Sequence, residues 1–198
     1  SNFIIFPSTT VPLNIFEPRY IEMIDDAMKG SRIIGMVQPK KSNNTNKPEL
    51  YNVGCAGKIV NFNETEDGRY LIALKGLSRF KIIGEINNEK KYRECQVSFN
   101  EFSSDIIKDN NKIKFTDLKL IFKDLKTLFE KKGYIINWNE LQKQSLDHTI
   151  NTLSMASPFS LEEKQILLET QNLNLRKTKL EEILKTYIVD DFNNTTIQ

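Results

Sequence analysis

The sequence predicts an α+β fold, in which a β-rich N-terminal half is followed by a helical C-terminal half. Six of the eight glycines lie between Gly30 and Gly76, among runs of β-branched and aromatic residues. From about Asn111 onward, apolar residues recur three and four positions apart, as they do on one face of a helix. Because strands and helices are segregated along the chain, the pattern favours an α+β fold over alternating βαβ units.

The predicted elements of the first half are short strands and one helix. Pro18 predicts the first position of that helix, because a proline there loses no hydrogen bond. The Asp67-Gly68 pair predicts a tight hairpin, since such a turn requires a positive φ. The predicted strands are 3–6, 33–37, 53–62, 70–75, 80–86 and 92–99. Strands of this length and spacing indicate a small closed or nearly closed barrel.

The second half is predicted to be a helical bundle. Apolar residues at helical spacing fill 118–129, 138–153 and 180–188. Gly133 is predicted to end the first of these helices. Ser160 and Glu163 have the spacing of a capping box, in which each side chain satisfies the other residue's backbone amide.

A boundary between two subdomains is predicted near residue 103. The β-rich subdomain is expected to cover residues 1–103 and the helical subdomain 104–192. A polar tail, 193–198, is expected to follow the last helix. The Lys- and Asn-rich stretch 40–48 is expected to be a solvated loop.

Composition excludes several classes of protein. The 198 residues include 28 Lys and Arg against 26 Asp and Glu, a net charge of +2, which is too balanced for a general nucleic-acid or membrane-surface binder. No apolar run reaches the roughly 18 residues that a membrane helix needs. Cys55 and Cys95 form no CxxC motif, which argues against a zinc site and against a disulfide scaffold. A cytoplasmic location is therefore predicted.

The residues themselves argue against an enzyme. His148 is the only histidine, so no Ser-His, Cys-His or poly-His metal site is predicted. Residues 54–58 faintly resemble a phosphate loop, but their spacing is wrong and Ile59 stands where a Ser or Thr would hold magnesium. Asp25-Asp26 and Glu162-Glu163 are interpreted as solvated or capping charges, because helix neighbours point apart. No catalytic, cofactor-binding or metal-binding residue is predicted.

Several motifs resemble, in their order along the chain, the N-terminal substrate-binding domain of Lon, an ATP-dependent protease. They are PLNIFEPRY at 12–20, IIGMVQP at 33–39, VGCAGKI at 53–59, DGRY at 67–70, LKGLSRF at 74–80, MASPF at 155–159 and EEKQILLE at 162–169. Each motif alone is modest evidence, but their shared order covers nearly the whole chain. The strong use of Lys, Asn and Ile is typical of an AT-rich bacterial genome, so a bacterial member of the family is expected.

The resemblance implies both a fold and a role. The implied fold is a PUA-like pseudo-barrel followed by a helical subdomain, in agreement with the periodicity of the sequence. The implied role is to engage unfolded or client polypeptide in protein quality control. In Lon this domain precedes an ATPase module with a phosphate loop and a proteolytic module with a Ser-Lys dyad, and this sequence contains neither. No cofactor is expected.

The residues that match the family motifs are expected to support the fold more than to bind. They are Pro12, Glu17, Arg19, Tyr20, Gly54, Gly57, Asp67, Gly68, Arg69, Gly76, Arg79 and Phe80. The planar guanidinium of Arg79 suits a carboxylate, and Glu17 is the hypothetical partner. Gly68 is expected to hold a positive φ, and Gly76 is expected to serve a turn in the same way.

Three functional hypotheses remain open. The first is a non-catalytic polypeptide-binding module, for which Tyr51, Phe62 and Leu77 are the candidate contacts, although each of them also suits a barrel core. The second is a PUA-like RNA-binding module, supported only by Lys40, Lys41 and Lys47 and disfavoured by the near-neutral charge. The third is an adaptor or scaffold that delivers clients to a separate ATP-dependent protease.

The two ends of the sequence also carry expectations. The polar segment after the last helix lacks a long helical continuation, which favours a stand-alone member of the family. The first residues resemble the middle of the family's opening, so a further strand is expected to precede Ser1. The client and the oligomeric state are not predictable from these residues.

Overall fold

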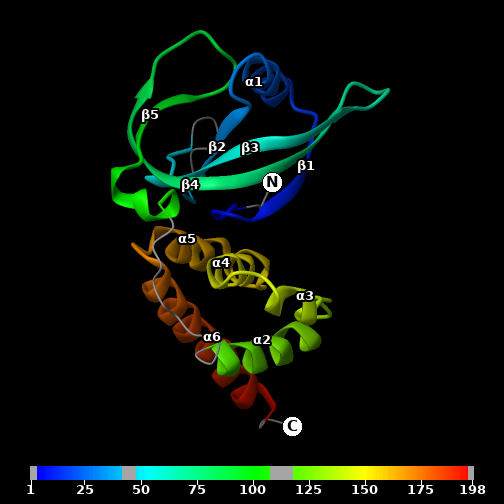
Figure 1. Ribbon diagram of the computed structural model, residues 1–198, viewed down its shortest axis with the longest axis vertical. Helices are drawn as coiled ribbons and strands as arrows, with labels where there is room; N and C mark the ends of the chain where they lie inside the picture. Colours follow the sequence, from blue (N-terminus) through cyan, green and yellow to red (C-terminus); the bar gives the residue numbers. More distant parts are fainter. Residues whose placement is uncertain (1–3, 42–47, 108–117, 196–198) are drawn as a thin grey trace. The chain divides into compact units, whose positions relative to one another are not determined.

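The computed structural model describes residues 4–41, 48–107 and 118–195 (Figure 1). The chain divides into two compact units, Ser1–Lys108 and Asp109–Gln198. The predicted boundary between residues 103 and 104 falls inside η1 (Asn100–Asp105), a 3-10 helix that belongs to the first unit. Strands come first and helices follow, which confirms the predicted α+β class.

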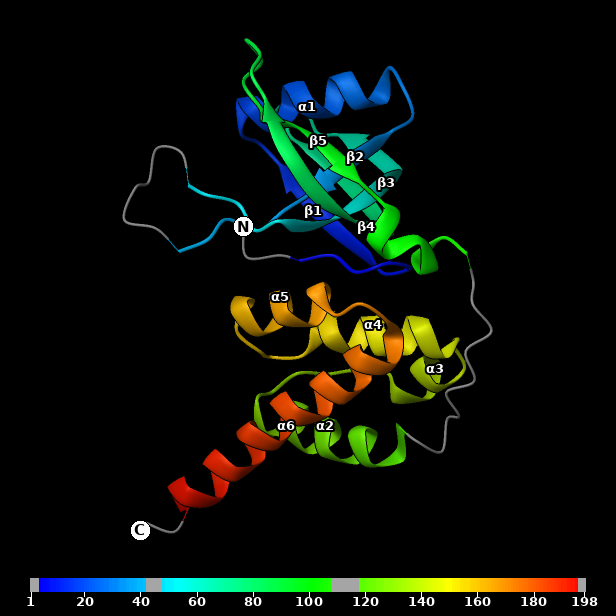
Figure 2. The same ribbon diagram turned by 90° about the vertical axis from the view of Figure 1, so that its left-hand side faces the viewer.

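Unit 1 is an antiparallel sheet with one helix packed over it (Figures 1 and 2). Its elements are β1 (Thr10–Ile15), α1 (Pro18–Met28), β2 (Ile33–Met36), β3 (Val53–Glu64), β4 (Tyr70–Ile86) and β5 (Glu94–Ser98). The hydrogen-bonded order is β1-β4-β3-β2, and β5 also pairs with β4. β4 is therefore the central strand of the unit, because it pairs with β1, β3 and β5.

The strands predicted at 70–75 and 80–86 are one continuous strand, β4. The prediction of a turn at Gly76 with a positive φ is wrong, since Gly76 lies inside the strand and only Gly68 and Gly133 are glycines with positive φ in the described chain. At a register shift opposite Ala56 and Gly57 of β3, Leu77 is an extra residue of β4, and the pairing continues on both sides of it. A glycine is needed at position 76 because a Cβ there would lie 2.1 Å from the Phe6 carbonyl oxygen.

The first strand lies later in the chain than predicted. Residues 4–6, the described part of the predicted strand 3–6, are buried but not in a strand, and β1 begins at Thr10. Pro12 weakened the strand signal of this segment, because proline cannot donate a ladder hydrogen bond. β1 tolerates it because β4 is its only partner strand among the described residues, so it is an edge strand.

Two glycines of β3 make room for large side chains of the sheet. A Cβ on Gly54 would lie 2.7 Å from Cζ of Phe80 and 2.7 Å from the Met36 carbonyl oxygen. A Cβ on Gly57 would lie 2.6 Å from Cγ of Leu74. Phe80 and Leu74 are both buried. The segment that faintly resembles a phosphate loop is thus a strand whose glycines serve packing.

The local signals of unit 1 lie where the sequence predicts them. Pro18 is the first residue of α1, whose Ile24 is fully buried. Gly68 has a φ of 77° in the hairpin between β3 and β4. The backbone amide of Thr65 donates to the Arg69 carbonyl at 2.9 Å across this turn.

Unit 2 consists of helices (Figure 1). They are α2 (Lys119–Lys131), α3 (Trp138–Gln142), α4 (Leu146–Ala156), α5 (Leu161–Glu169) and α6 (Leu173–Thr195). α6 packs against α2, α4 and α5. The predicted stripe at 138–153 is divided between α3 and α4, and α6 runs into the predicted polar tail 193–198, of which residues 196–198 lie outside the described chain.

Two predicted helix ends are confirmed in unit 2. Gly133 has a φ of 72° after α2, and the Tyr134 amide donates to the Phe129 carbonyl at 2.9 Å. Ser160 and Glu163 form the capping box of α5. Glu163 Oε2 also accepts a 2.7 Å hydrogen bond from the Tyr187 hydroxyl of α6, and burial together with this carboxylate raises the pKa of Tyr187 to about 12.

Replacement of Gly54 by alanine is expected to destabilise unit 1 by about 1–3 kcal/mol, because the added methyl group overpacks the Phe80 ring. The matched control is Gly84→Ala, since a Cβ on Gly84 would meet no atom within 4 Å. Urea denaturation followed by circular dichroism measures both changes. Equal unfolding midpoints for the two variants would contradict this account of Gly54.

Candidate functional site

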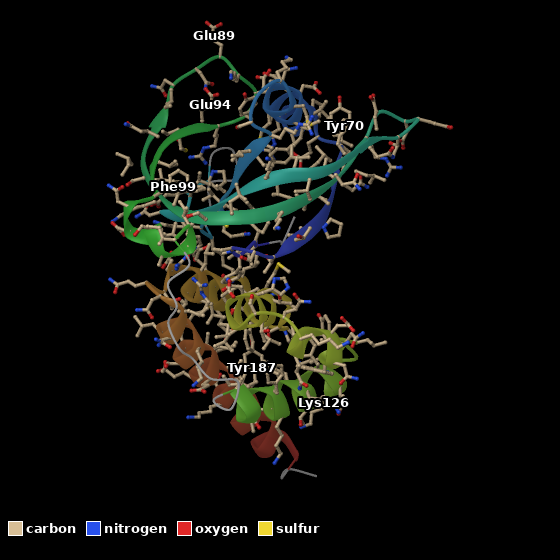
Figure 3. All side chains as sticks on the ribbon, in the orientation of Figure 1. Tyr70, Glu89, Glu94, Phe99, Lys126 and Tyr187 are labelled. Carbon is tan, nitrogen blue, oxygen red and sulfur yellow. The ribbon has the colours of Figure 1, made fainter. Side chains whose placement is uncertain are left out.

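The sheet of unit 1 has two unlike faces. On the inner face, Leu74 is opposite Val11 of β1 and Ile59 of β3, and all three side chains are buried. Tyr70 lies four positions before Leu74 and therefore on the same face. Its hydroxyl donates to Asp25 of α1 at 2.9 Å, so α1 covers this side of the sheet (Figure 3).

The outer face consists of the alternate positions along the same strands. The register aligns Thr10, Pro12 and Asn14 of β1, Leu71, Ala73 and Lys75 of β4, Lys58, Asn61 and Asn63 of β3, and Ile33 of β2. All of these side chains are exposed except that of Ala73, which is half-buried. The outer face is therefore an open sheet surface across four strands.

Apolar side chains on and beside the outer face remain in contact with water. Leu71 and Ile33 are each 43% exposed. Val60 lies at a register shift of β3 beside this face and is 54% exposed, and Leu77 of β4 is 37% exposed. Exposed apolar side chains that gather on one surface are typical of sites that bind other molecules.

The structure does not bring the three predicted binding residues together. Leu77 is exposed beside the outer face. Phe62 is opposite Ile72 on the inner face, where its half-buried ring packs edge-on against Tyr70 with centroids 4.9 Å apart. Tyr51 is half-buried before β3, and its amide donates to the Gln38 carbonyl at 3.0 Å.

The buried guanidinium of Arg79 binds Asp105, a residue that the sequence reading did not single out. Arg79 Nε donates to Asp105 Oδ2 and Nη2 donates to Oδ1, each at 2.8 Å. The Arg79 backbone amide also donates to Oδ2, at 3.0 Å. The Phe102 ring lies under the guanidinium, 4.3 Å from Cζ to the centroid. The Arg79 side chain is 1% exposed, so this pair attaches η1 to β4 away from water.

The hypothesis that Glu17 is the partner of Arg79 is wrong. Glu17 accepts a hydrogen bond from Arg19 Nε at 2.9 Å, and both side chains are about half exposed. Arg19 in turn lies over the Tyr20 ring, 4.5 Å from Cζ to the centroid. These motif residues form a local surface cluster at the start of α1. The error has a plain cause, because any carboxylate in the sequence could match a guanidinium until the tertiary contacts were known.

The adjacent carboxylates Asp25 and Asp26 are not merely solvated, which corrects their interpretation from the sequence. Tyr70 donates to Asp25, and the Tyr92 hydroxyl donates to Asp26 Oδ2 at 2.9 Å. The hydrogen bond from Tyr92, followed by that from Lys29, lowers the pKa of Asp26. These two tyrosine–aspartate bonds fasten α1 to β4 and to the segment before β5. Tyr70 belongs to the DGRY motif, which does not predict its aspartate partner, and Tyr92 lies in no motif.

Asp67 and Arg69 form an exposed ion pair at the hairpin. Arg69 Nε lies 2.8 Å from Asp67 Oδ2, and the Thr65 hydroxyl also donates to Asp67. The hydrogen bond from Arg69, then that from Thr65, lowers the pKa of Asp67 to about 2. These residues serve the turn around Gly68 rather than a reaction.

Neither a metal centre nor a basic loop is evident in the described parts of the chain. Within residues 4–41, 48–107 and 118–195, no three His, Cys, Asp or Glu side chains gather as metal ligands do. His148 is half-buried in α4. Of the three lysines suggested for RNA, Lys40 forms an ion pair with Glu49, Lys41 is exposed, and Lys47 lies outside the described residues.

The chain matches a known family. The profile of the ATP-dependent protease La (LON) substrate-binding domain matches residues 1–186. The chain belongs to this family. The resemblance seen in the sequence motifs is thereby confirmed.

Among curated relatives, the chain is 27% identical over 181 residues to Lon protease of Flavobacterium johnsoniae, covering 88% of this chain and 22% of that protein. It is 24% identical over 186 residues to Lon protease of Syntrophus aciditrophicus, covering 86% of this chain and again 22% of the relative. The chain thus spans about a fifth of the length of these Lon proteases, and it is their substrate-binding domain that it matches.

Solved structures agree on the fold. A Lon N-terminal domain protein from Xanthomonas campestris superposes with a TM-score of 0.63 at 17% identity, covering 93% of this chain and 94% of that one. The N-terminal domain of Mycobacterium avium complex Lon protease gives 0.59 at 16% identity, covering 95% and 94%. In the described part of this Lon-type domain, no helix combines the length and apolarity that crossing a membrane requires.

Arg79→Ala is expected to lower the free energy of unfolding by about 3–5 kcal/mol, because it leaves the Asp105 carboxylate buried without its cation. Glu17→Ala is the control and is expected to change it by less than about 0.5 kcal/mol, since its ion pair is exposed. Urea denaturation followed by circular dichroism distinguishes them. If Glu17→Ala were the more damaging change, the assignment of Asp105 as the partner would fail.

Tyr92→Phe is expected to raise the pKa of Asp26 towards its ordinary value, because the main hydrogen bond to the carboxylate is lost. Tyr70→Phe is the control, since Tyr70 binds Asp25 and not Asp26. NMR titration of the side-chain carboxyl carbons measures both. In the parent protein, Asp26 stabilises the fold above its unfolded pKa of about 3.9, and this contribution is lost as the pH falls through the lowered folded value. An unchanged titration of Asp26 in Tyr92→Phe would refute the assignment.

Proposed function

We propose that this chain is a non-catalytic module that binds unfolded or client polypeptides. The match to the Lon substrate-binding domain over residues 1–186 is the observation that carries the proposal. The matched family domain is the part of Lon that bears neither the ATPase nor the protease. The proposal assigns no catalytic residue and no cofactor to this chain.

The outer face of unit 1 supports this function. A polypeptide of varied sequence can be held by exposed apolar side chains, which require no specific partner. Leu71, Ile33, Val60 and Leu77 supply such side chains on one surface. In this proposal Leu77 contacts the polypeptide directly, whereas Phe62 and Tyr51, which are half-buried, support the sheet.

The RNA-binding alternative has less support. Phosphate recognition needs clustered, available lysines and arginines, and Lys40 of the suggested loop is already paired with Glu49. Single-stranded RNA binding also favours exposed aromatic platforms, and no aromatic residue occupies the aligned positions of the outer face. RNA is therefore retained as an outcome of the binding experiment.

The biological setting of the proposal is protein quality control in the cytoplasm. A module that binds clients without cleaving them requires an ATP-dependent protease to act on them. That protease is either covalently continuous with this domain, as in the Lon relatives, or a separate protein to which this one delivers clients. A pull-down with the full chain as bait, analysed for ATP-dependent proteases, distinguishes these arrangements.

The first test is a titration of a fluorescent, permanently unfolded polypeptide with the protein, followed by anisotropy. A folded protein and a single-stranded RNA are titrated alongside. Saturable binding of the unfolded chain alone is the expected result. Binding of RNA alone, with a steep loss on addition of salt, would replace the proposal with the nucleic-acid alternative.

Leu71→Ser and Leu77→Ser are each expected to weaken binding of the unfolded polypeptide by roughly three- to tenfold. Each change removes part of a leucine contact that the bound polypeptide would bury, worth about 1 kcal/mol. Leu175→Ser in α6 is the matched control, since Leu175 is 48% exposed but lies in unit 2. The same anisotropy titration measures all three. Equal affinities for the three variants would exclude the outer face as the binding surface.

A further inference from the structure

We propose that the outer face selects extended polypeptide segments in which acidic residues alternate with apolar ones. The inference rests on the proposed function, and it adds the chemistry of the preferred client. It is carried by two lysines that face each other across neighbouring strands of an otherwise uncharged surface. They are Lys58 of β3 and Lys75 of β4.

Lys58 and Lys75 occupy directly opposite positions in the β3–β4 ladder. Side chains at such positions have Cβ atoms about 5 Å apart, and like charges there repel each other. Both lysines are exposed. Neither forms an ion pair with any residue in the described part of the chain, in contrast to Lys81 and Lys90 of the same unit, which bind Glu101 and Glu94.

Among the described residues, no acidic side chain occupies the aligned positions of the outer face around this lysine pair. At the aligned positions of the outer face, the neighbours of the two lysines are Thr10, Ile33 and Ala73, followed by asparagines and leucine. Asp25 and Asp26 belong to α1 on the opposite side of the sheet, where they accept hydrogen bonds from Tyr70 and Tyr92. A carboxylate from outside would replace repulsion between two ammonium groups with attraction to both.

The rest of the face fits an extended chain. A strand-like segment presents side chains on alternate sides every two residues, about 7 Å apart along the chain. Leu71 and Ile33 offer apolar contacts, and Asn14 and Asn63 flank Leu71 with amides that can both donate to and accept from a peptide backbone. A bound segment whose acidic side chains lie over the two lysines, and whose apolar side chains lie over Leu71 and Ile33, matches the distribution of charge and apolar surface on this face.

The lysine pair favours polypeptide over nucleic acid as the occupant. Two cations are few for a phosphate backbone, which repeats its charge at every nucleotide. The asparagine and leucine side chains of the face also lack the stacking surface that single-stranded bases use. A segment of protein carrying one or two carboxylates requires no more charge than Lys58 and Lys75 provide.

The test compares two fluorescein-labelled, unstructured peptides of equal length that alternate leucine with either glutamate or lysine. The protein is the full chain, and the variants are Lys58→Glu with Lys75→Glu, and Lys123→Glu with Lys126→Glu. The second pair is the matched control, because both of its lysines are exposed on α2 and the net charge changes equally (Figure 3 labels Lys126). The first variant keeps a like-charged cross-strand pair, so its fold is expected to persist, and circular dichroism verifies this.

The parent protein and the α2 variant are expected to bind the glutamate peptide at least about tenfold more tightly than the lysine peptide at low salt, with the preference fading near about 0.5 M salt. The Lys58→Glu, Lys75→Glu variant is expected to lose or reverse that preference. Should it unfold, Lys58→Gln with Lys75→Gln takes its place, and loss of the preference is again expected.

Other outcomes overturn the inference in distinguishable ways. Equal binding of both peptides by the parent, or equal effects of the two double variants, would refute the acidic preference while leaving polypeptide binding intact. Binding of neither peptide, together with no binding of a permanently unfolded protein, would refute the proposed function itself. Binding of single-stranded RNA that only the Lys58→Glu, Lys75→Glu variant loses would assign the lysines to phosphate.

Discussion

A guanidinium that is fully removed from water must be neutralised where it lies, and this requirement at Arg79 organises the β-rich unit. Asp105 meets it with two side-chain hydrogen bonds of 2.8 Å and a third from the backbone amide. Because Asp105 ends η1, the chain leaving β5 must return to the middle of β4. Phe102 closes the site from the side of η1 and keeps water from the pair. The buried Arg79–Asp105 ion pair thus determines where η1, the last element of unit 1, packs against the sheet.

β4 can hold η1 in this way because it is one continuous strand that pairs with three others. The continuity of β4 depends on glycines, which have no side chain, as much as on the side chains that pack around it. Gly54 and Gly57 of β3 leave space for Phe80 and Leu74, and Gly76 leaves space for the Phe6 carbonyl. A methyl group at any of these positions would meet another atom at under 3 Å. Close packing therefore explains the glycine-rich motifs that resemble the Lon domain without assigning them to a ligand.

The same pleat that buries one side of the sheet exposes the other. Leu74 and Ile72 point inward, and Leu71 and Lys75, on either side of them in the strand, point to water. In the proposed function, this exposed surface is where a polypeptide binds. In that proposal, its apolar side chains supply affinity of low specificity, and its two facing lysines add a preference in charge. Membership of the Lon substrate-binding family and the physical character of this face support the same function.

The sequence by itself determined the features that are encoded within a few residues of one another. The α+β order, the hairpin at Gly68, the proline start of α1, the capping box of Ser160 and the family resemblance all belong to this class. Each depends on backbone conformation or on hydrogen bonds between near neighbours, so the local residues suffice.

Only the tertiary structure decided the partner of Arg79, the continuity of β4 through Gly76, and the bonds from Tyr70 and Tyr92 to α1. It also decided which of the candidate binding residues reach water, because Leu77 and Phe62 are both apolar residues of strands and differ only in face. These outcomes depend on strand register and on contacts between residues distant in the chain. A shift of register by one residue would reverse every side chain of a strand, and no local pattern fixes that register.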